Sequence, residues 1–453
     1  MHSVVEPAAR PSREPDAETS ETFRRLLLNT LVTGVTSSFL WFALTFWVYL
    51  ETHSVVATAM IGAAFSLSSA FLGPVMGTFV DRHRKHVAIT AATLVAVGAF
   101  AFATAIFLAI DTDSLLRLRS PWFWLFVVVT LLGSVAGQLR SIALSTCVTL
   151  LVPEAGRDKA NGMVGTVTGI SFAITSVFSG LAIGQLGMGW ALYGSLALTV
   201  GALVHLGTIR IDEADPEPDP NGSTAHVDVR GAVEAIRAVP GLGMLIAFAA
   251  FNNLLAGVFM ALMDAYGLTL VSVETWGFLF GGISLAFIGG GLIVSRYGLG
   301  SNPLRVILLG NLCNWAVCSV FTISNSVIPL TIGMVVWLAL IPAIEAAEQT
   351  VLQRSIPFER QGRVFGFAQL VENAAAPVTA IAMGPLAERF FMPLMSDGAG
   401  ADAIGGWFGT GPERGLALMF TIAGVIGVLV TLLARASRSY RRLSEAWVPA
   451  TVA

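Results

Sequence analysis

Long apolar runs separated by short polar connections repeat along almost the whole chain. A helix that spans a bilayer needs about 20 apolar residues, and twelve segments of the sequence meet this requirement. They are 24–50, 55–80, 87–110, 122–150, 162–184, 187–207, 241–270, 275–295, 304–324, 327–351, 362–388 and 414–435. We therefore predict an all-α membrane protein with twelve transmembrane helices. Because this number is even, both ends of the chain are expected on the same side of the membrane.

The longest polar interruption, residues 208–240, divides the predicted helices into six plus six. Its first half is acidic and rich in proline, which predicts a flexible linker. Its second half places Val229, Val233 and Ile236 on one helical face, which predicts a short amphipathic helix on the membrane surface. The expected organisation is a disordered tail (1–22), a six-helix bundle (23–207), the linker (208–240), a second six-helix bundle (241–436) and a C-terminal tail (437–453).

The two halves of the chain also repeat each other. GTFVDR (77–82) follows the second predicted helix, and GLIVSR (291–296) follows the eighth. LVPEAGRDKANG (151–162) follows the fourth, and SIPFERQGR (355–363) follows the tenth. Internal repeats of this kind are typical of transporters, whose substrate site lies where the repeats meet.

Composition and charge agree with a membrane protein and exclude several other classes. Charged residues make up only 12% of the chain, compared with about 25% in soluble proteins. The net charge of −3 gives no footprint for nucleic acid. No cysteine or histidine motif indicates a metal, no Walker motif indicates ATP, and no nucleophile–base arrangement indicates an enzyme. We expect neither a cofactor nor a catalytic site.

The basic residues predict the orientation. Of the 26 lysines and arginines, 21 fall in the two tails and in the loops on the same side as the tails. Basic residues are retained on the cytoplasmic side of a membrane. We therefore predict a multi-pass protein of the plasma or inner membrane with both termini in the cytoplasm.

Taken together, the twelve segments, the long central linker and the stretch GTFVDRHRK (77–85) resemble the major facilitator superfamily of secondary transporters. ERQGRVFGFAQL (359–370) and GWFGTGPERGLAL (406–418) are similar to the branch that contains macrolide and other drug:proton antiporters and the enterobactin exporter. The resemblance implies two six-helix bundles that rock against each other. Antiporter branches often carry a Gly-Pro motif in the fifth helix. The corresponding stretch GISFAITSVFSG (169–180) has no proline, which argues against proton antiport but not against export.

The charged loop after the second helix is the first candidate site. Gly73 and Gly77 are spaced to let a neighbouring helix approach closely. Asp81 lies at the C-terminal end of its helix, where the dipole disfavours an anion, so it needs a partner. The resemblance implies that it bridges to the cytoplasmic ends of neighbouring helices while the transporter is open outward.

The basic residues of this loop, Arg82, Arg84 and Lys85, belong to the same predicted gate. An alternative is that they only retain the loop in the cytoplasm. In the second half of the chain Ser295 replaces the aspartate, which predicts an uneven pair of latches with the stronger one in the N-terminal half.

Polar residues deep within predicted helices are the second candidate site. Each charge costs about 2.5–3.5 kcal/mol at a helix centre, so each is a functional candidate. The candidates for substrate binding and proton coupling are Arg140, Asn252, Asn253, Glu345, Glu348 and Glu372. In the resembling fold, Arg140 would face the three acids across a central cavity, and a proton would bind and leave as access alternates. The alternative is a structural ion pair or hydrogen bond between packed helices.

We therefore expect a secondary transporter that exports an amphiphilic small molecule, drug-like or siderophore-like, by proton antiport. Its partners would be the small-molecule substrate, protons and the lipid bilayer, and it would be a monomer. The alternatives are an uptake symporter or facilitator with the same fold, or a membrane receptor or scaffold that transports nothing. Retention of Asp81 and of several intramembrane acids argues against the scaffold.

Overall fold

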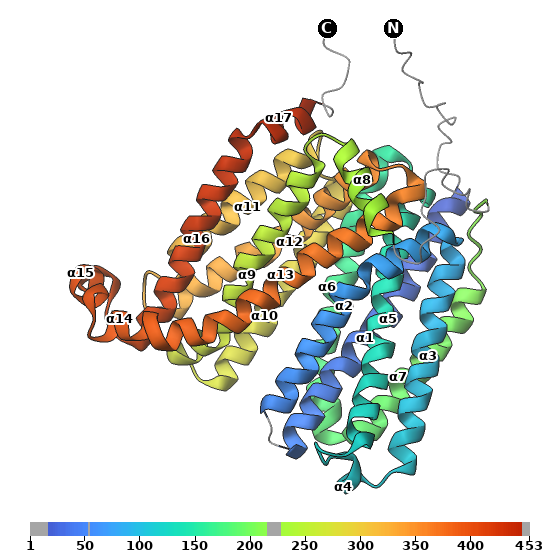
Figure 1. The fold of residues 1–453 in the computed structure, drawn as a ribbon, viewed down its shortest axis with the longest axis horizontal. Coiled ribbons are helices and arrows are strands. Elements are labelled where there is room, and N and C mark those ends of the chain that lie inside the picture. Colours follow the sequence, from blue (N-terminus) through green and yellow to red (C-terminus); the bar gives the residue numbers. More distant parts are fainter. Residues whose placement is uncertain (1–16, 53–54, 215–227, 446–453) are drawn as a thin grey trace.

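The computed structural model describes residues 17–52, 55–214 and 228–445. These residues form helices and connections and contain no strand. Two bundles of long helices meet at one end and diverge toward the other (Figure 1). The predicted all-α architecture of two six-helix bundles is confirmed. We call the end that carries α8 and α17 the terminal face, and the opposite end the far face.

The first bundle contains six long helices and one short one. They are α1 (Ala17–Thr52), α2 (Val55–Arg82), α3 (Lys85–Ala109), α4 (Thr112–Leu115), α5 (Pro121–Leu151), α6 (Arg157–Gln185) and α7 (Gly187–Gly207), with a 3-10 turn η1 (Glu154–Gly156) before α6. Local sequence signals fix several helix starts. At α5, for example, the Ser120 hydroxyl accepts a hydrogen bond from the backbone N–H of Trp122, and Pro121 occupies the first turn.

The second bundle also contains six long helices, with shorter elements at both faces. The long helices are α9 (Leu242–Leu270), α10 (Val273–Tyr297), α11 (Pro303–Val320), α12 (Val327–Ser355), α13 (Gln361–Leu386) and α16 (Pro412–Ala436). The shorter elements are α8 (Val229–Ala238), η2 (Phe358–Arg360), the π-helical turn η3 (Ala387–Phe391), α14 (Met392–Ser396), α15 (Ala399–Phe408) and α17 (Arg438–Glu445).

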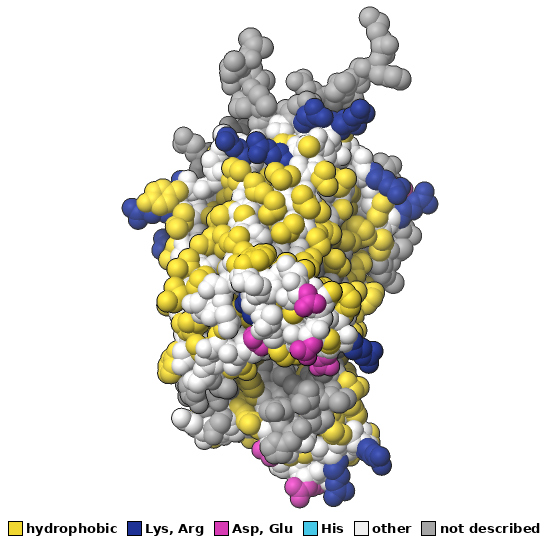
Figure 2. Space-filling view, turned by 90° about the vertical axis from the view of Figure 1, so that its left-hand side faces the viewer, with side chains coloured by type: hydrophobic (Ala, Val, Ile, Leu, Met, Phe, Trp, Pro, Cys, Tyr) yellow, Lys and Arg dark blue, Asp and Glu magenta, His cyan; other side chains and the backbone are white. Residues whose placement is uncertain are grey.

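Within the described residues, eleven helices are long and apolar enough to cross a membrane. The other long helix, α6, has 29 residues but is rich in glycine, serine and threonine. Figure 2 shows a broad hydrophobic band on the side of the molecule next to α16. Lysine and arginine side chains gather beyond this band toward the terminal face. The outer surface therefore has the apolar belt of a multi-pass membrane protein.

The buried apolar residues form three cores. One core lies at the terminal face and is continuous across both bundles, from Val80 and Leu144 to Val294 and Phe365. The other two cores are separate, one within each bundle. The bundles therefore pack as one body at the terminal face and as two bodies toward the far face.

Two expectations about the polar segments need correction. Helix α8 forms as predicted. It contacts α9 and α13 and buries Ala232, Ala235 and Ile236, so it does not lie only on the membrane surface. The expectation of a flexible linker does not hold at Glu213, which is buried against α3. Residues 215–227 of the predicted linker, residues 1–16 of the predicted N-terminal tail and residues 446–453 of the predicted C-terminal tail lie outside the described residues.

Candidate functional site

The two bundles touch most closely where four glycines of α2 and α13 face each other. A Cβ atom on Gly73 would lie 2.5 Å from the carbonyl oxygen of Gly366, and a Cβ on Gly362 would lie 2.5 Å from that of Gly77. Helix backbones approach this closely only where side chains are absent. The predicted close approach at Gly73 and Gly77 is confirmed, and the approaching helix belongs to the other bundle. We call this contact, together with Asp81 and Arg363, the seal.

Asp81 closes the seal by binding the N-terminus of α13. Its carboxylate accepts hydrogen bonds from the backbone N–H groups of Gly362 (2.6 Å) and Arg363 (2.9 Å) and from Nε of Arg363 (2.9 Å). The side chain is only 1% exposed. An anion is favoured at a helix N-terminus. The partner that Asp81 requires is therefore supplied across the bundle interface.

The basic residues after Asp81 differ in their surroundings. Arg82 and Arg84 are exposed, whereas Lys85 is buried. The Lys85 ammonium lies 3.2 Å from a carboxylate oxygen of Glu213 and 4.7 Å from the ring centre of Phe358 in the second bundle. Lys85 is therefore part of the contact between the bundles and is more than a topology signal.

A buried amide network joins the bundles at a second place on the terminal face. Nδ2 of Asn161 on α6 donates to the Thr350 hydroxyl (3.0 Å) and to Oε1 of Gln353 (2.9 Å), both on α12. Nε2 of Gln353 donates to the carbonyl oxygen of Ser145 on α5 (3.0 Å). Our sequence interpretation missed these residues. The signal for Asn161 was its place in the repeated stretch 151–162, but nothing local marks Gln353.

Arg140 does not lie where the sequence predicted. Its guanidinium donates to Asn29 Oδ1 (2.5 Å) and Thr30 Oγ1 (3.3 Å) on α1 and to Thr93 Oγ1 (3.2 Å) on α3. All these partners belong to the first bundle, and Asn29 in turn donates to the Ala202 carbonyl of α7. The expectation that Arg140 faces the acids of the second bundle is corrected, because neutral acceptors within its own bundle already bind it.

The three predicted acids do come together. Glu345 and Glu348 lie three residues apart on α12, and both lie near enough to Glu372 on α13 to interact with it electrostatically. One oxygen of Glu348 and one of Glu372 are buried without a hydrogen-bond partner. In the described part of the chain, no ion pair joins these acids to an arginine or lysine. Two carboxyl groups attract each other only with a proton between them, so the pair Glu348–Glu372 is suited to hold a proton.

Two amide side chains lie close in sequence to the acids on the same helices. The oxygens Oε1 of Gln349 on α12 and of Gln369 on α13 are also buried without a partner. Both helices contact the first bundle as well, α12 through α5 and α6 and α13 through α2 and α5. The cluster therefore presents acceptor oxygens close to the bundle interface. The described residues contain no group of acids, histidines and cysteines arranged to hold a metal ion.

The predicted asparagines of α9 are placed differently. Asn252 Nδ2 donates to the Phe248 carbonyl (2.7 Å), and its Oδ1 accepts from Trp315 Nε1 on α11 (2.5 Å). The amide of Asn252 therefore links two helices of one bundle, and its role in substrate binding stays a prediction. Asn253 is half-buried and makes no hydrogen bond to another described residue.

The stretch GWFGTGPERG has a structural role at the far face. Gly409 and Gly411 adopt positive φ angles of 91° and 127°, which favour glycine, and Pro412 begins α16. Arg414 follows and is almost fully buried. Its guanidinium donates to the carbonyl oxygens of Phe408 (2.6 Å) and Ile323 (2.6 Å). Arg414 therefore ties three segments of the far face together.

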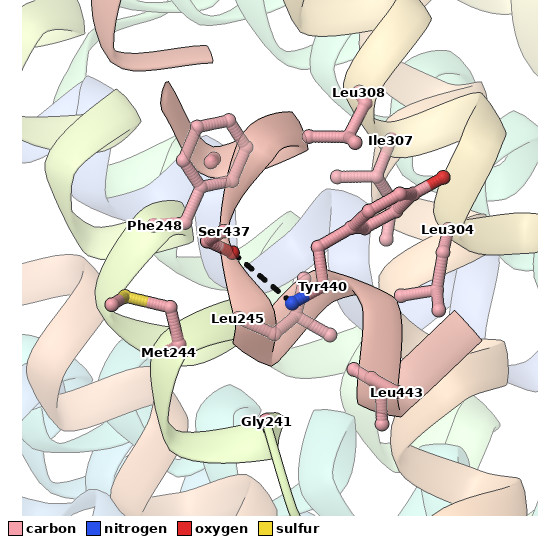
Figure 3. A pocket seen from close by; sticks show the side chains of 11 residues that line it. Gly241, Met244, Leu245, Phe248, Leu304, Ile307, Leu308, Ser437, Tyr440 and Leu443 are labelled. Carbon is pink, nitrogen blue, oxygen red and sulfur yellow. Dashed lines mark hydrogen bonds between the residues drawn. The ribbon is translucent and has the colours of Figure 1, made fainter. Parts of the chain in front are cut away.

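An apolar pocket lies beneath the elbow between α16 and α17. In Figure 3 the ring of Tyr440 on α17 points toward Ile307 and Leu304 of α11, and the Ser437 hydroxyl accepts a hydrogen bond from the backbone N–H of Tyr440 (3.1 Å). Its volume is about 30 Å³, and drug-sized ligands require about 300 Å³ or more. We therefore interpret it as a packing gap under α17 and not as a substrate site.

Comparisons with known proteins agree with this architecture. Residues 26–380 match the family model of the Major Facilitator Superfamily. Macrolide efflux protein A of Streptococcus pyogenes is 24% identical over 375 residues, which cover 79% of this chain and 87% of that protein.

Solved structures show the same likeness. A bacterial homologue of the iron transporter ferroportin, in an outward-facing state, superposes with a TM-score of 0.66 at 15% identity, covering 92% of this chain and 100% of that chain. The E. coli fucose:proton symporter superposes with a TM-score of 0.65 at 12% identity, covering 91% and 99%. At these identities the likeness concerns the fold.

Proposed function

The chain belongs to the Major Facilitator Superfamily and is a transporter, not an enzyme, and we propose that it exports a basic amphiphilic small molecule in exchange for protons. The observation that carries this proposal is the pair of buried acids Glu348 and Glu372, which have oxygens without a hydrogen-bond partner and no basic partner among the described residues. A protonated amine and a proton would compete for this pair. Competition of this kind couples export of the one to entry of the other.

The neighbouring side chains fit a basic substrate. Glu345 adds a third carboxyl group, and the Gln349 and Gln369 oxygens can accept hydrogen bonds from N–H groups. Aromatic side chains in the first bundle, where Trp41 stacks on Phe65 (4.6 Å), offer an apolar surface for the rest of the molecule.

The proposed direction rests on charge and on similarity. The excess of basic residues near the terminal face supports a cytoplasmic terminal face in the plasma or inner membrane. The described conformation would then be sealed toward the cytoplasm and divergent toward the outside. The similarity to a macrolide efflux protein favours export. An uptake symporter with the same fold remains the second candidate, supported by the likeness to a proton symporter.

Transport in proteoliposomes with an imposed pH gradient tests the proposal. We expect a pH gradient to drive movement of erythromycin or tetraphenylphosphonium, and a protonophore to abolish it. Glu348→Gln or Glu372→Gln should reduce the driven flux by roughly tenfold or more, because a charge-assisted hydrogen bond contributes about 1.5–3 kcal/mol. Substrate exchange at equal pH should weaken as well, because the protonated amine binds the same pair.

The matched control is Asp402→Asn, which changes an exposed acid on α15. Flux that is indifferent to the pH gradient would contradict proton antiport. In cells without their own efflux pumps, a protonophore-sensitive increase in substrate accumulation would instead favour the uptake symporter.

A further inference from the structure

The linker between the bundles contributes two buried acids to the seal. Glu213 lies shortly after the end of α7, and Asp228 directly precedes α8. Both side chains are almost fully buried, at 4% exposure each. Burial of a carboxylate is unfavourable unless it is paired and hydrogen-bonded, so these positions need a physical explanation.

Glu213 binds the start of α3. One carboxylate oxygen accepts the backbone N–H of Lys85 (2.5 Å), and the other lies 3.2 Å from the Lys85 ammonium. Residue Arg84, at the N-cap position of α3, provides no side-chain cap, so Glu213 takes that place. The same ammonium faces the Phe358 ring of the second bundle. Lys85 is therefore shared between a linker acid and a partner across the interface.

Asp228 repeats this arrangement at the other cation. One carboxylate oxygen accepts from Arg363 Nη1 (2.6 Å), and the other caps α8 by accepting the backbone N–H of Gly231 (2.8 Å). The same guanidinium donates through Nε to Asp81 of the first bundle. Arg363 is therefore also shared between a linker acid and a partner across the interface.

The two kinds of contact respond differently to separation of the bundles. The bonds from Asp81 to α13 and the contact of Lys85 with Phe358 cross the interface, so they break when the terminal face opens. The backbone N–H of Asp228 also donates to the Thr78 hydroxyl of α2 (3.1 Å), a bond that crosses the interface and breaks with the others. Glu213 follows the first bundle, and Asp228 precedes a helix that packs on α9 and α13 of the second. The pairs Glu213–Lys85 and Asp228–Arg363 therefore survive the opening.

We propose that Glu213 and Asp228 are positioning residues that release the seal. Glu213 holds Lys85 on the first bundle, and Asp228 holds Arg363 on the second. Each acid thereby weakens the attraction of its cation to the opposite bundle. Without Asp228, the guanidinium of Arg363 would interact with Asp81 more strongly, and the closed seal would be favoured. The proposal rests on the rocking motion of the proposed function and not on the substrate or the direction of transport.

The test compares acids that touch the same arginine. Spin labels on Val87 and Glu359, two exposed positions next to the seal, report opening of the terminal face in the reconstituted full-length chain. Asp81→Asn should increase the open fraction. Asp228→Asn, which keeps an N-cap acceptor, and Glu213→Gln should each decrease it by roughly fivefold or more. The exposed acids Asp212→Asn and Glu234→Gln serve as matched controls and should leave it unchanged.

The change in the open fraction should have opposite signs in Asp81→Asn and Asp228→Asn. If both acids only stabilised the closed seal, both variants would open it, so opposite signs distinguish release from stabilisation. If Asp228→Asn opens the terminal face or leaves it unchanged, the proposal is refuted. If a single variant assembles poorly, the double variant of Asp81 and Asp228 still tests the proposal. It should open no further than Asp81→Asn alone, because Asp228 acts through the attraction between Arg363 and Asp81, and a further opening would refute the proposal. A wild-type protein that never opens at this face would instead refute the rocking motion itself.

Discussion

Replacing Gly73 by alanine tests whether the glycine contact controls the transport cycle. The new Cβ would lie 2.5 Å from the carbonyl oxygen of Gly366 and 3.6 Å from the backbone nitrogen of Leu370. Carbon–oxygen contacts between packed helices lie at about 3.3–3.6 Å. Helices α2 and α13 must therefore separate by roughly 0.8 Å, and neither neighbour is a flexible side chain that can rotate away.

The expected size of the effect follows from this clash. Overpacking of a close contact costs about 1–3 kcal/mol. The strain exists only while the bundles are in contact, so it destabilises the sealed conformation and not the separated one. The equilibrium should then shift toward opening at the terminal face by about 5- to 150-fold.

The measurement is the distance distribution between labels on Val87 and Glu359, with and without substrate. Gly62→Ala is the matched control, because Gly62 lies on the same helix and a Cβ there would have no neighbour within 4 Å. If Gly73→Ala and Gly62→Ala give the same distribution, the glycine contact does not hold the sealed conformation and the reasoning fails.

Two further substitutions test the placements of Arg140 and Arg414. Arg140→Leu should leave the Oδ1 acceptor of Asn29 unpaired and lower the free energy of unfolding by about 1–3 kcal/mol. The dependence of driven flux on the pH gradient should stay the same. A changed dependence would restore the proton-coupling role first expected for Arg140. Arg414→Leu removes the donors of two carbonyl groups, and each unpaired carbonyl should lower the free energy of unfolding by about 1–3 kcal/mol. The melting temperature of this variant should therefore fall well below that of the control Arg389→Leu. Equal melting temperatures would contradict an anchoring role.

The seal was largely predictable because each of its residues makes a local physical demand. Gly73 and Gly77 leave one stripe of α2 without side chains, and Asp81 places an anion where its own helix disfavours it. Both demands can be read from consecutive residues. Arg363 was within reach too, since it ends the repeated stretch 355–363.

The environment of Arg140 was not predictable in this way. Counting residues along α5 gives the depth of Arg140 but not the direction of its side chain. That direction depends on Asn29 and Thr93, which lie 111 and 47 residues away in the chain. A buried arginine needs no counter-ion when the fold surrounds it with neutral acceptors. Only the packing of α1 and α3 against α5 shows that such acceptors surround Arg140.

The two halves of the chain make their corresponding contacts unequally, and the reason is electrostatic. In the second half the Ser295 hydroxyl donates to the Leu292 carbonyl of its own helix. The anion there is Asp158, which lies in the first turn of α6 and accepts the backbone N–H of Leu299 (2.9 Å). The dipole of its own helix stabilises Asp158, whereas Asp81 depends on the dipole of a helix in the other bundle. Separation of the bundles therefore costs Asp81 its main stabilisation and leaves Asp158 most of its own, so release of Asp81 is the step that opposes opening.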